Sequence, residues 1–381
     1  MKVERSLFDS ANGWRVLPGS DELSQAHLVL HFGAKELLET PHYYDILRNQ
    51  YPDAQIVGCS TAGEIIDTEV HDNTAVACAV EFASTEVRVG ARNMVDVVDS
   101  FYAGVELGSE LSAPDLRSVL VISDGIQVNG SELVRGLTSA VGKGVPVSGG
   151  LAGDADRFSS TLVSCNGPAE AGKIAVVGLY GDRVTVGHGS VGGWDPFGPE
   201  RTITRSKGNV LYELDGRPAL DLYKRYLGDE AANLPGSALL FPLMVRSPDS
   251  DEIGLVRTVL GIDEDEQSMT FAGDLPQGFK AQLMRANFER LIDGAGEAAR
   301  ICNARQNESR KLAVLISCVG RKMVLGQRTA EEVQAVASLL GDGVSQLGYY
   351  SYGEISPHVR LGSCELHNQT MTVTVLSEGD D

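Results

Sequence analysis

Short apolar runs, each followed directly by a turn rich in glycine or hydroxyl residues, constrain the fold of this chain most strongly. Such runs cover residues 27–33, 54–60, 117–125, 146–150 and 312–320. They are too short for buried helices and have the length of buried strands. Stretches of helical character separate several of them. Strands that alternate with helices predict an α/β fold, and the helix-free middle of the chain makes it a mixed α+β variant with mixed sheets.

The clearest break in the pattern falls near residues 206–217. We therefore expect a lead-in over residues 1–23, an N-terminal domain over 24–205 and a C-terminal domain over 206–381. An internal echo supports two related layered halves, because residues 60–65 (STAGEI) and 351–355 (SYGEI) both follow an apolar run.

Three local features complete the expected secondary structure. Ser84 and Thr85 separate two strand-like runs and favour a hairpin. Residues 279–303 form the longest helical stretch, by the 3–4 spacing of their apolar positions. Thr329 with Glu332 three residues on has the pattern of a capping box at the start of a helix.

Charge and composition exclude several classes of protein. The formal net charge is −20, and no basic run is present. This argues against a nucleic-acid binder and against an anionic membrane surface. No apolar stretch approaches the ~18 residues of a membrane span, and the first residues lack the apolar core of a signal peptide. The six cysteines show no C-x-x-C spacing, so we expect reduced thiols and a cytoplasmic location.

Two strand-end loops are candidate ligand-binding elements. In the first, Ser60 and Thr61 offer hydroxyl groups, and Gly63 lets a ligand approach the backbone. In the second, Asp154 closes a glycine-rich turn that begins at Gly149. Ligand sites of α/β folds form at such strand ends. Tight structural turns explain both loops equally well. A nucleophile elbow at Ser60 is disfavoured, because that motif needs glycine where Ala62 stands.

His188 is flanked by Gly187 and Gly189, which predicts an accessible imidazole. With Trp194 and Phe197 nearby, it is a candidate axial ligand for a non-covalent haem. The alternative is a hydrogen-bonded loop histidine, which is the commoner role. The surrounding Gly-x-Gly-x-x-Gly pattern does not predict a dinucleotide site, since no helix should follow it. No histidine or cysteine spacing predicts a metal site.

Several ordered motifs together resemble the FIST family. Residues 56–65 (IVGCSTAGEI) resemble the signature of its N-terminal domain, and residues 149–154 (GGLAGD), with Phe158 and Thr161, resemble its second signature. Residues 350–355 (YSYGEI) with 366–370 (LHNQT) resemble the closing motif of its C-terminal domain. The resemblance covers about residues 24–376.

The resemblance implies a bacterial sensor that binds small ligands, amino acids among them. It also implies partners such as histidine kinases of two-component systems, cyclic-di-GMP enzymes or chemoreceptors. One branch of similar proteins senses nitric oxide through haem. This chain has no kinase, receiver or DNA-binding motif of its own, so its output would pass through a partner.

We therefore expect a cytoplasmic, non-enzymatic sensor of a small, amino-acid-like ligand. Backbone donors would hold a carboxylate, and Glu354 an ammonium group. A haem-based nitric oxide sensor that regulates a histidine kinase and a hydrolase that uses Ser60 are the alternatives. The expected ligand-binding residues are Ser60, Thr61, Gly63, Asp154, Ser351, Tyr352, Glu354 and Asn368.

Overall fold

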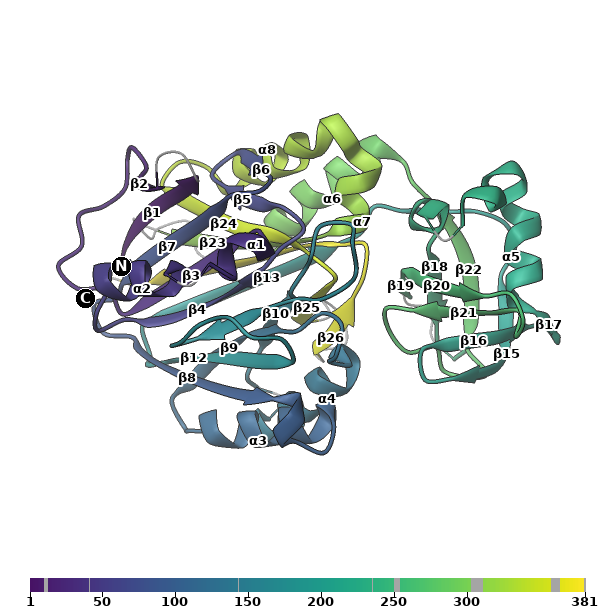
Figure 1. The fold of residues 1–381 in the computed structure, drawn as a ribbon, viewed down its shortest axis with the longest axis horizontal. Helices are drawn as coiled ribbons and strands as arrows, with labels where there is room; N and C mark the ends of the chain where they lie inside the picture. The colour runs from purple at the N-terminus through teal and green to yellow at the C-terminus, as the bar shows by residue number, and fades with distance from the viewer. Residues whose placement is uncertain are drawn as a thin grey trace.

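The computed structural model describes residues 1–9, 13–40, 42–142, 144–234, 236–249, 254–302, 311–357 and 364–379. Three six-stranded sheets form the main body, and a nine-stranded sheet forms a smaller unit beside it (Figure 1). Helices cover the outer faces of the main body. The expected mixed α/β architecture with layered, mixed sheets is confirmed.

The first sheet has the strand order β11-β4-β3-β7-β1-β2. Its strands are β1 (Lys2–Asp9), β2 (Gly13–Val16), β3 (Leu28–Gly33), β4 (Gln55–Ser60), β7 (Ala75–Glu81) and β11 (Val163–Cys165). The second sheet has the order β26-β25-β10-β9-β12-β8. Its strands are β8 (Glu86–Asn93), β9 (Leu116–Ser123), β10 (Val147–Leu151), β12 (Lys173–Tyr180), β25 (Gly353–Pro357) and β26 (Cys364–His367).

The third sheet has the order β13-β27-β23-β24-β5-β6. Its strands are β5 (Glu64–Ile66), β6 (Glu69–His71), β13 (Val184–Val191), β23 (Lys311–Cys318), β24 (Val344–Ser351) and β27 (Met371–Glu378). It therefore joins strands from both ends of the chain.

The three sheets share one plan, which extends the internal echo from two repeats to three. Each has a central parallel pair, β3 with β4, β9 with β10, and β23 with β24. Next to the first member of each pair lies an antiparallel strand, β7, β12 or β27. Each sheet also receives a strand from another repeat, because β11 pairs with β4, β25 with β10 and β5 with β24. The repeats are thus interlocked at their strand ends.

One core cluster draws side chains from all three sheets, so the sheets pack around a shared interior. Leu120 and Ile122 of β9 face this interior, whereas the alternate residues Val119 and Val121 face the helices. Helices α3 and α4 pack very closely over the second sheet. A Cβ atom on Gly136 would lie 2.1 Å from the carbonyl oxygen of Phe101, so glycine is required at this crossing.

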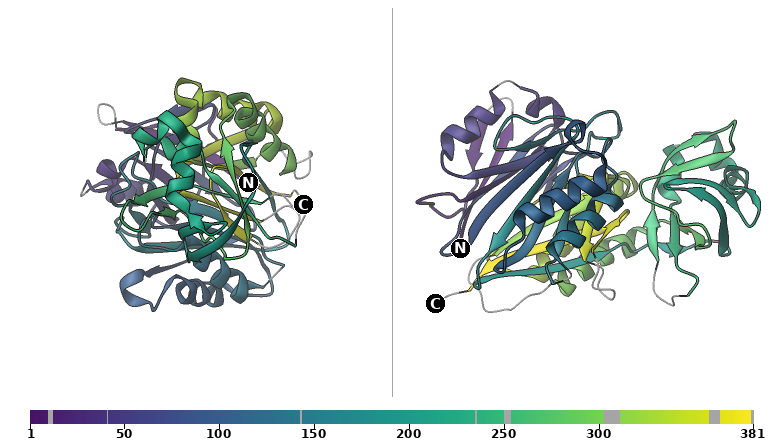
Figure 2. Two further views of the ribbon diagram at one scale, coloured as in Figure 1. Left: turned by 90° about the vertical axis from the view of Figure 1, so that its right-hand side faces the viewer. Right: turned by 90° about the horizontal axis from the view of Figure 1, so that it is seen from below.

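Helices of the main body flank the sheets on the outside (Figure 2). They are α1 (Lys35–Leu38), α2 (Tyr43–Gln50), α3 (Ser100–Leu111), α4 (Gly130–Val141), α6 (Phe288–Ile301), α7 (Val319–Leu325) and α8 (Thr329–Leu340). Short 3-10 turns are η1 (Met94–Asp96), η2 (Gly228–Asn233), η3 (Gly236–Leu240) and η4 (Gly326–Arg328).

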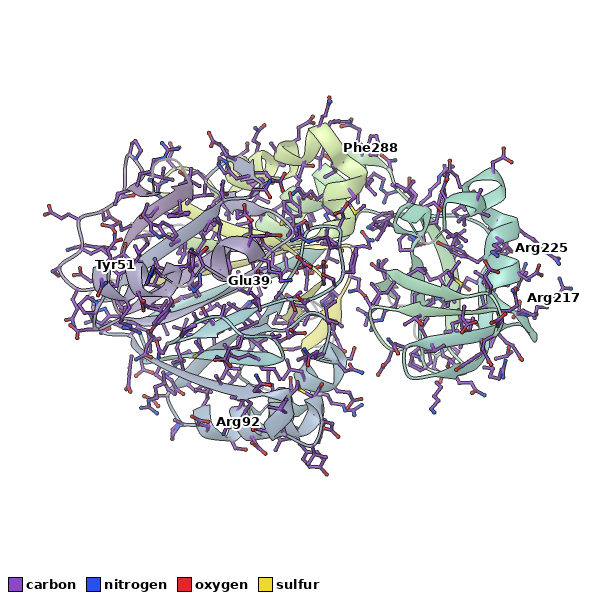
Figure 3. The ribbon with its side chains drawn as sticks, viewed as in Figure 1. Glu39, Tyr51, Arg92, Arg217, Arg225 and Phe288 are labelled. Atoms are coloured by element: carbon purple, nitrogen blue, oxygen red, sulfur yellow. The ribbon has the colours of Figure 1, made fainter. Side chains whose placement is uncertain are left out.

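The small unit interrupts the third repeat between β13 and α6. It comprises α5 (Ala219–Leu227) and the antiparallel strands β14 (Asp195–Pro196), β15 (Arg201–Lys207), β16 (Val210–Leu214), β17 (Arg217–Pro218), β18 (Leu243–Arg246), β19 (Leu255–Arg257), β20 (Val259–Asp263), β21 (Ser268–Phe271) and β22 (Lys280–Arg285). Ile203, Tyr223 and Phe271 belong to its separate core. Arg217 and Arg225 lie on its side turned away from the main body (Figure 3). The expected boundary between residues 205 and 206 falls inside β15, and residues 2–9 of the expected lead-in form β1.

Two local expectations are wrong. The strands β7 and β8, on either side of Ser84 and Thr85, belong to different sheets and form no hairpin. The Glu378 carboxylate accepts hydrogen bonds from the backbone N–H groups of Ala83, Ser84 and Thr85. A side chain far away in the sequence therefore pairs the backbone donors of this connecting segment. The expected helix over 279–303 is strand β22 followed by α6, whose N-cap is Asn287.

Candidate functional site

The loops at the strand ends of β4, β10 and β24 meet at one junction. The backbone N–H of Ala62 donates to the carbonyl oxygen of Tyr350 at 2.8 Å, and that of Tyr350 donates to Gly63 at 2.8 Å. The N–H of Gly153 donates to Ser60 at 2.9 Å. The structure therefore brings together the strand-end segments that the sequence singled out, through the exchange of strands between repeats.

Ser60 and Thr61 use their hydroxyl groups within the chain. Ser60 Oγ donates to the carbonyl oxygen of Gly153 at 2.7 Å and accepts from the N–H of Leu162 at 2.9 Å. Thr61 Oγ1 donates to the carboxyl group of Glu64. Both residues are buried. Their hydroxyl groups hold the junction together.

Gly63 is required by both its backbone and its surroundings. Its φ is +136°, a region that residues with a Cβ atom rarely adopt. A Cβ atom there would lie 2.4 Å from Nζ of Lys322, which donates to the carbonyl oxygen of Ala62 at 2.8 Å. Gly63 thus makes room for a lysine from α7.

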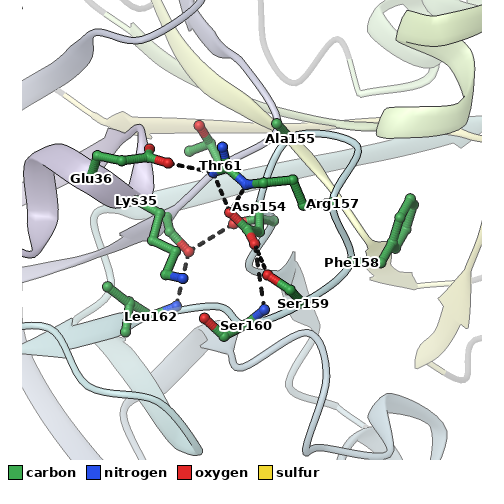
Figure 4. A network of polar contacts seen from close by, with 12 residues as sticks. Lys35, Glu36, Thr61, Asp154, Ala155, Arg157, Phe158, Ser159, Ser160 and Leu162 are labelled. Carbon is green, nitrogen blue, oxygen red and sulfur yellow. Dashed lines mark hydrogen bonds and ion pairs between the residues drawn. The ribbon is translucent and has the colours of Figure 1, made fainter.

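Asp154 is the centre of a polar network at the junction (Figure 4). Its side chain is fully buried and accepts hydrogen bonds from Arg157 and from the hydroxyl of Ser159 at 2.7 Å. Burial alone would raise the pKa of Asp154, but these hydrogen bonds and that from the Ser160 N–H hold it below its usual value. The carboxylate therefore stays charged, with Arg157 as its partner.

Tyr352 closes the same loop. Its ring stacks on Phe158 with centroids 4.3 Å apart, and its hydroxyl accepts from the Phe158 N–H at 3.0 Å. Phe158 has a φ of +48°, which is strained for a bulky residue. Burial raises the pKa of Tyr352 to about 12. Tyr352 thus holds the strained loop in place as a neutral phenol.

Glu64 and Glu354 occupy matching positions in two repeats. Glu64 pairs in register with His71, and Glu354 pairs in register with His367. Burial raises the pKa of Glu64 to about 7 and that of Glu354 to about 8. Ser351 Oγ donates to Glu354 at 2.6 Å, as does the N–H of Thr370 at 3.1 Å. A carboxyl group that is mostly protonated at neutral pH makes a poor partner for an ammonium group.

Asn368 differs from the other expected site residues in having a free side chain. It is 0% exposed, yet neither its amide nitrogen nor its amide oxygen has a hydrogen-bond partner. The adjacent Gln369, which the sequence analysis did not select, is also 0% exposed with both amide atoms unpartnered. The turn between β26 and β27 therefore buries four unsatisfied polar atoms, an arrangement that is rare in proteins.

This turn lies where the small unit meets the main body. Arg257 of β19 donates to the carbonyl oxygen of Leu366 at 2.8 Å. Trp194, in the segment that leads into the small unit, donates from its indole to the carbonyl oxygen of Gln369 at 2.9 Å. The side chain of Gln369 faces Gly320 of α7, where a Cβ atom would lie 2.4 Å from its amide nitrogen. Interfaces between structural units are preferred places for ligand sites.

The repeat offers a sequence signal for Gln369. Residues 69–74 (EVHDNT) and 365–370 (ELHNQT) follow Glu64 and Glu354 in the same way. Asn73 and Gln369 hold equivalent left-handed positions, with φ values of +59° and +62°. This second repeat of sequence marks Gln369 as a candidate beside Asn368.

A buried ion pair between Arg321 and Glu332, which no pattern in the sequence predicts, lies beside the turn, and Arg321 Nη1 donates to the carbonyl oxygen of Gln369 at 3.5 Å. Arg321 Nη2 lies 2.7 Å from Glu332 Oε2, and both side chains are 0% exposed. The expected capping box is wrong, because Thr329 is the first residue of α8 rather than its N-cap, and Glu332 binds Arg321 instead. The buried Thr329 hydroxyl instead donates to the carbonyl oxygen of Lys322 at 3.3 Å.

His188 lies in strand β13 rather than in an open loop. Both ring nitrogens are buried and have no partner, and burial lowers the pKa of this imidazole to about 4. The expectation of an accessible imidazole is wrong for the ring nitrogens, although the residue as a whole is partly exposed. Gly189 makes room for α6, since a Cβ atom there would lie 2.0 Å from the carbonyl oxygen of Ala298. Buried ring nitrogens do not fit an axial haem ligand, whose nitrogen must reach the iron.

Other binding features are limited in the part of the chain that the structure describes. Those residues include no group of three or more His, Cys, Asp or Glu side chains placed to hold a metal ion. None of the described helices is both long enough and apolar enough to cross a membrane.

Comparison with known proteins identifies the family. The model of the FIST N domain matches residues 27–217, and that of the FIST C domain matches residues 219–357. No curated protein matches significantly. A crystal structure of cyanuric acid hydrolase from A. caulinodans matches 100% of this chain and 99% of its own at 8% identity, with a TM-score of 0.38, a likeness too weak to carry any inference. FIST domains are sensory domains of signal transduction that bind small ligands. The chain belongs to the FIST family and contains both its N and C domains.

Proposed function

We propose that this protein is a sensor of a small polar ligand and that the ligand binds at the turn between β26 and β27. The observation that carries this proposal is the pair of buried, unpartnered amides of Asn368 and Gln369. Each buried polar group without a partner costs about 1–3 kcal/mol. A ligand that bonds these amides would recover that cost, so the turn is preorganised for binding rather than for stability.

An amino-acid-like ligand suits these two side chains. Each amide offers N–H donors for a carboxylate and a carbonyl oxygen for an ammonium group. Asn368 and Gln369 could therefore serve both ends of the ligand, whereas the carboxyl group of Glu354 is already used by Ser351 and Thr370. In this proposal Glu354 holds the turn in place from behind and does not touch the ligand.

A binding role also suits the environment of the candidate nucleophiles. Ser60 Oγ is committed to two backbone groups, and burial raises the pKa of the adjacent Cys59 thiol. A reactive cysteine needs a lowered pKa and access to solvent. The proposed output is contact with a partner in the bacterial cytoplasm, a histidine kinase or a cyclic-di-GMP enzyme, as membership of a family of signal-transduction sensors suggests.

The test is binding of free amino acids to the full chain by isothermal titration calorimetry. Asn368→Leu and Gln369→Leu should weaken binding at least about tenfold, which corresponds to one lost hydrogen bond. Asn209→Leu is the matched control, because the Asn209 amide bonds to Phe271 within the small unit, away from the turn. Equal affinity in the wild type and both turn variants would place the site elsewhere.

A further inference from the structure

Arg257 extends from the small unit to the turn that we propose as the ligand site. The residue is 5% exposed. Its Nη1 donates to the carbonyl oxygen of Leu366 at 2.8 Å, and its Nε donates to that of Asp274 at 3.2 Å. Room for the guanidinium comes from Gly273, where a Cβ atom would lie 2.9 Å from its central carbon. The residue that Arg257 contacts, Leu366, lies two positions before Asn368 in the sequence.

The charge of Arg257 lacks a direct counter-ion. Within the described segments, no carboxylate lies at ion-pair distance from it, and both of its hydrogen bonds go to uncharged carbonyl oxygens. Burial lowers the pKa of Arg257 to about 10, which keeps it protonated at neutral pH. Buried charges in proteins are normally paired. The carboxylates of Glu365 and Asp274 act on this charge only from beyond ion-pair distance, so Arg257 is a buried cation without a directly bound anion.

A guanidinium has five N–H donors, and these two bonds use two of them. Its planar fork can bind two oxygens of a carboxylate or of a phosphate at once. By contrast, Arg217 and Arg225 of the same unit lie on its far side (Figure 3). The position of Arg257 is thus specific to the contact with the main body.

We propose that the ligand carries a carboxylate group, which Arg257 receives while the amides of Asn368 and Gln369 bind its remaining polar atoms. This inference rests on the proposed function and adds the ligand's charge and the participation of the small unit. Because Arg257 belongs to one unit and the amides to the other, the bound ligand bridges the two. Trp194, in the connecting segment, bonds to Gln369 and links the turn to the position of the small unit.

The proposal is tested by calorimetry on the full chain with a matched set of probes. The set contains the free amino acids, the corresponding amino acid amides, which lack the carboxylate, simple carboxylic acids of the same side chains, and inorganic phosphate. Arg257→Gln retains donors for the carbonyl oxygens but removes the charge. Arg205→Gln removes the same charge from the exposed Arg205–Glu213 pair and is the control. Unfolding midpoints of both variants exclude a folding defect.

We expect at least one carboxylate probe to bind at micromolar to millimolar concentration, and to bind about tenfold or more weakly to Arg257→Gln but unchanged to Arg205→Gln. Its amide should bind about tenfold more weakly to the wild type. Equal binding of acid and amide, preference for phosphate, or unchanged affinity in Arg257→Gln overturns the carboxylate assignment. If Asn368→Leu still abolishes that binding, the site stands and only the ligand class is wrong. If Asn368→Leu has no effect either, or if no probe binds, both proposals fail.

Discussion

Arg321 and Glu332 form an ion pair that solvent does not reach, with Arg321 Nη2 2.7 Å from Glu332 Oε2 and both side chains 0% exposed. The other oxygen of Glu332 accepts hydrogen bonds from Ser317 at 3.0 Å and from Tyr350 at 2.7 Å. Arg321 also donates to the carbonyl oxygen of Leu291 at 2.8 Å. This pair therefore ties α6, α7, α8 and the third sheet together behind the proposed ligand site.

Arg321→Met should lower the free energy of unfolding by about 3–5 kcal/mol, because it leaves the buried charge of Glu332 without a partner. Chemical denaturation monitored by circular dichroism measures this loss. Adding Glu332→Gln to Arg321→Met should recover part of the stability, since the uncompensated charge is then removed. Arg300→Met is the control, as the Arg300–Glu297 pair is exposed and its loss should leave stability unchanged. A stable Arg321→Met protein would show that the pair contributes little.

The raised pKa of Glu354 makes stability depend on pH in a defined direction. Its pKa is about 8 in the folded protein against an ordinary 4.5, so the folded state binds the extra proton between these values. The contribution is therefore complete below pH 4.5 and is lost as pH rises toward 8. Buried His188 opposes this in part, because its pKa is lowered to about 4.

Glu354→Gln isolates the contribution of this one carboxyl group. The unfolding free energy of the wild type minus that of Glu354→Gln should fall between pH 5 and 8 by up to about 1.4 kcal/mol per pH unit. Urea titrations at four pH values give this difference. Glu39→Gln, at an exposed site, should give a flat difference. A flat or rising difference for Glu354→Gln would mean that Glu354 is ionised in the folded protein.

Ser60 should not react with a fluorophosphonate probe in the native protein. Its hydroxyl is 0% exposed and donates to the carbonyl oxygen of Gly153, so it lacks both access and a general base. Intact-mass spectrometry after incubation measures labelling, and the Ser60→Ala variant identifies any label at that position. Stoichiometric labelling of the wild type that is lost in Ser60→Ala would favour the hydrolase alternative.

Haem added to the protein should give only a weak, broad Soret band. Both ring nitrogens of His188 are buried, so iron cannot reach them in the conformation that the structure shows. His188→Ala should leave the band unchanged in an absorption titration. A sharp band at one haem per chain that disappears in His188→Ala would instead support a haem-based sensor.

Local pattern was enough to predict the strands and the loops at their ends. Apolar runs such as 54–60 and 312–320 are buried strands, β4 and β23. The segments at Ser60, Asp154 and Ser351 each lie at the end of the second strand of a parallel pair, and this placement is readable from sequence. Their meeting is not, because the three strands belong to three different sheets that exchange strands.

Contacts between residues far apart in the sequence determine the other features of the fold and of the site. Such contacts leave little trace in the sequence. The repeat that contains β9 and β10 was not predicted, because its loop is held by Asp154 and Arg157 rather than by the Gly-Glu-Ile pattern of the other two repeats. Arg257 and Leu366 are 109 positions apart and meet only because β19 docks against β26. Similarly, whether the Asn368 amide has a hydrogen-bond partner depends on which groups the fold places around it. None of these can be read from spacing along the chain.

The central claim is that the buried amide of Asn368 serves ligand binding and not stability. Its most direct test is the thermal unfolding midpoint of the full chain and of Asn368→Leu, with and without the amino acid that binds best. Without ligand, Asn368→Leu should unfold at the same or a higher temperature, because an apolar side chain removes an unsatisfied buried group. With ligand, only the wild type should be stabilised. A variant that unfolds several degrees earlier without ligand, yet is stabilised by it as much as the wild type, would contradict the claim.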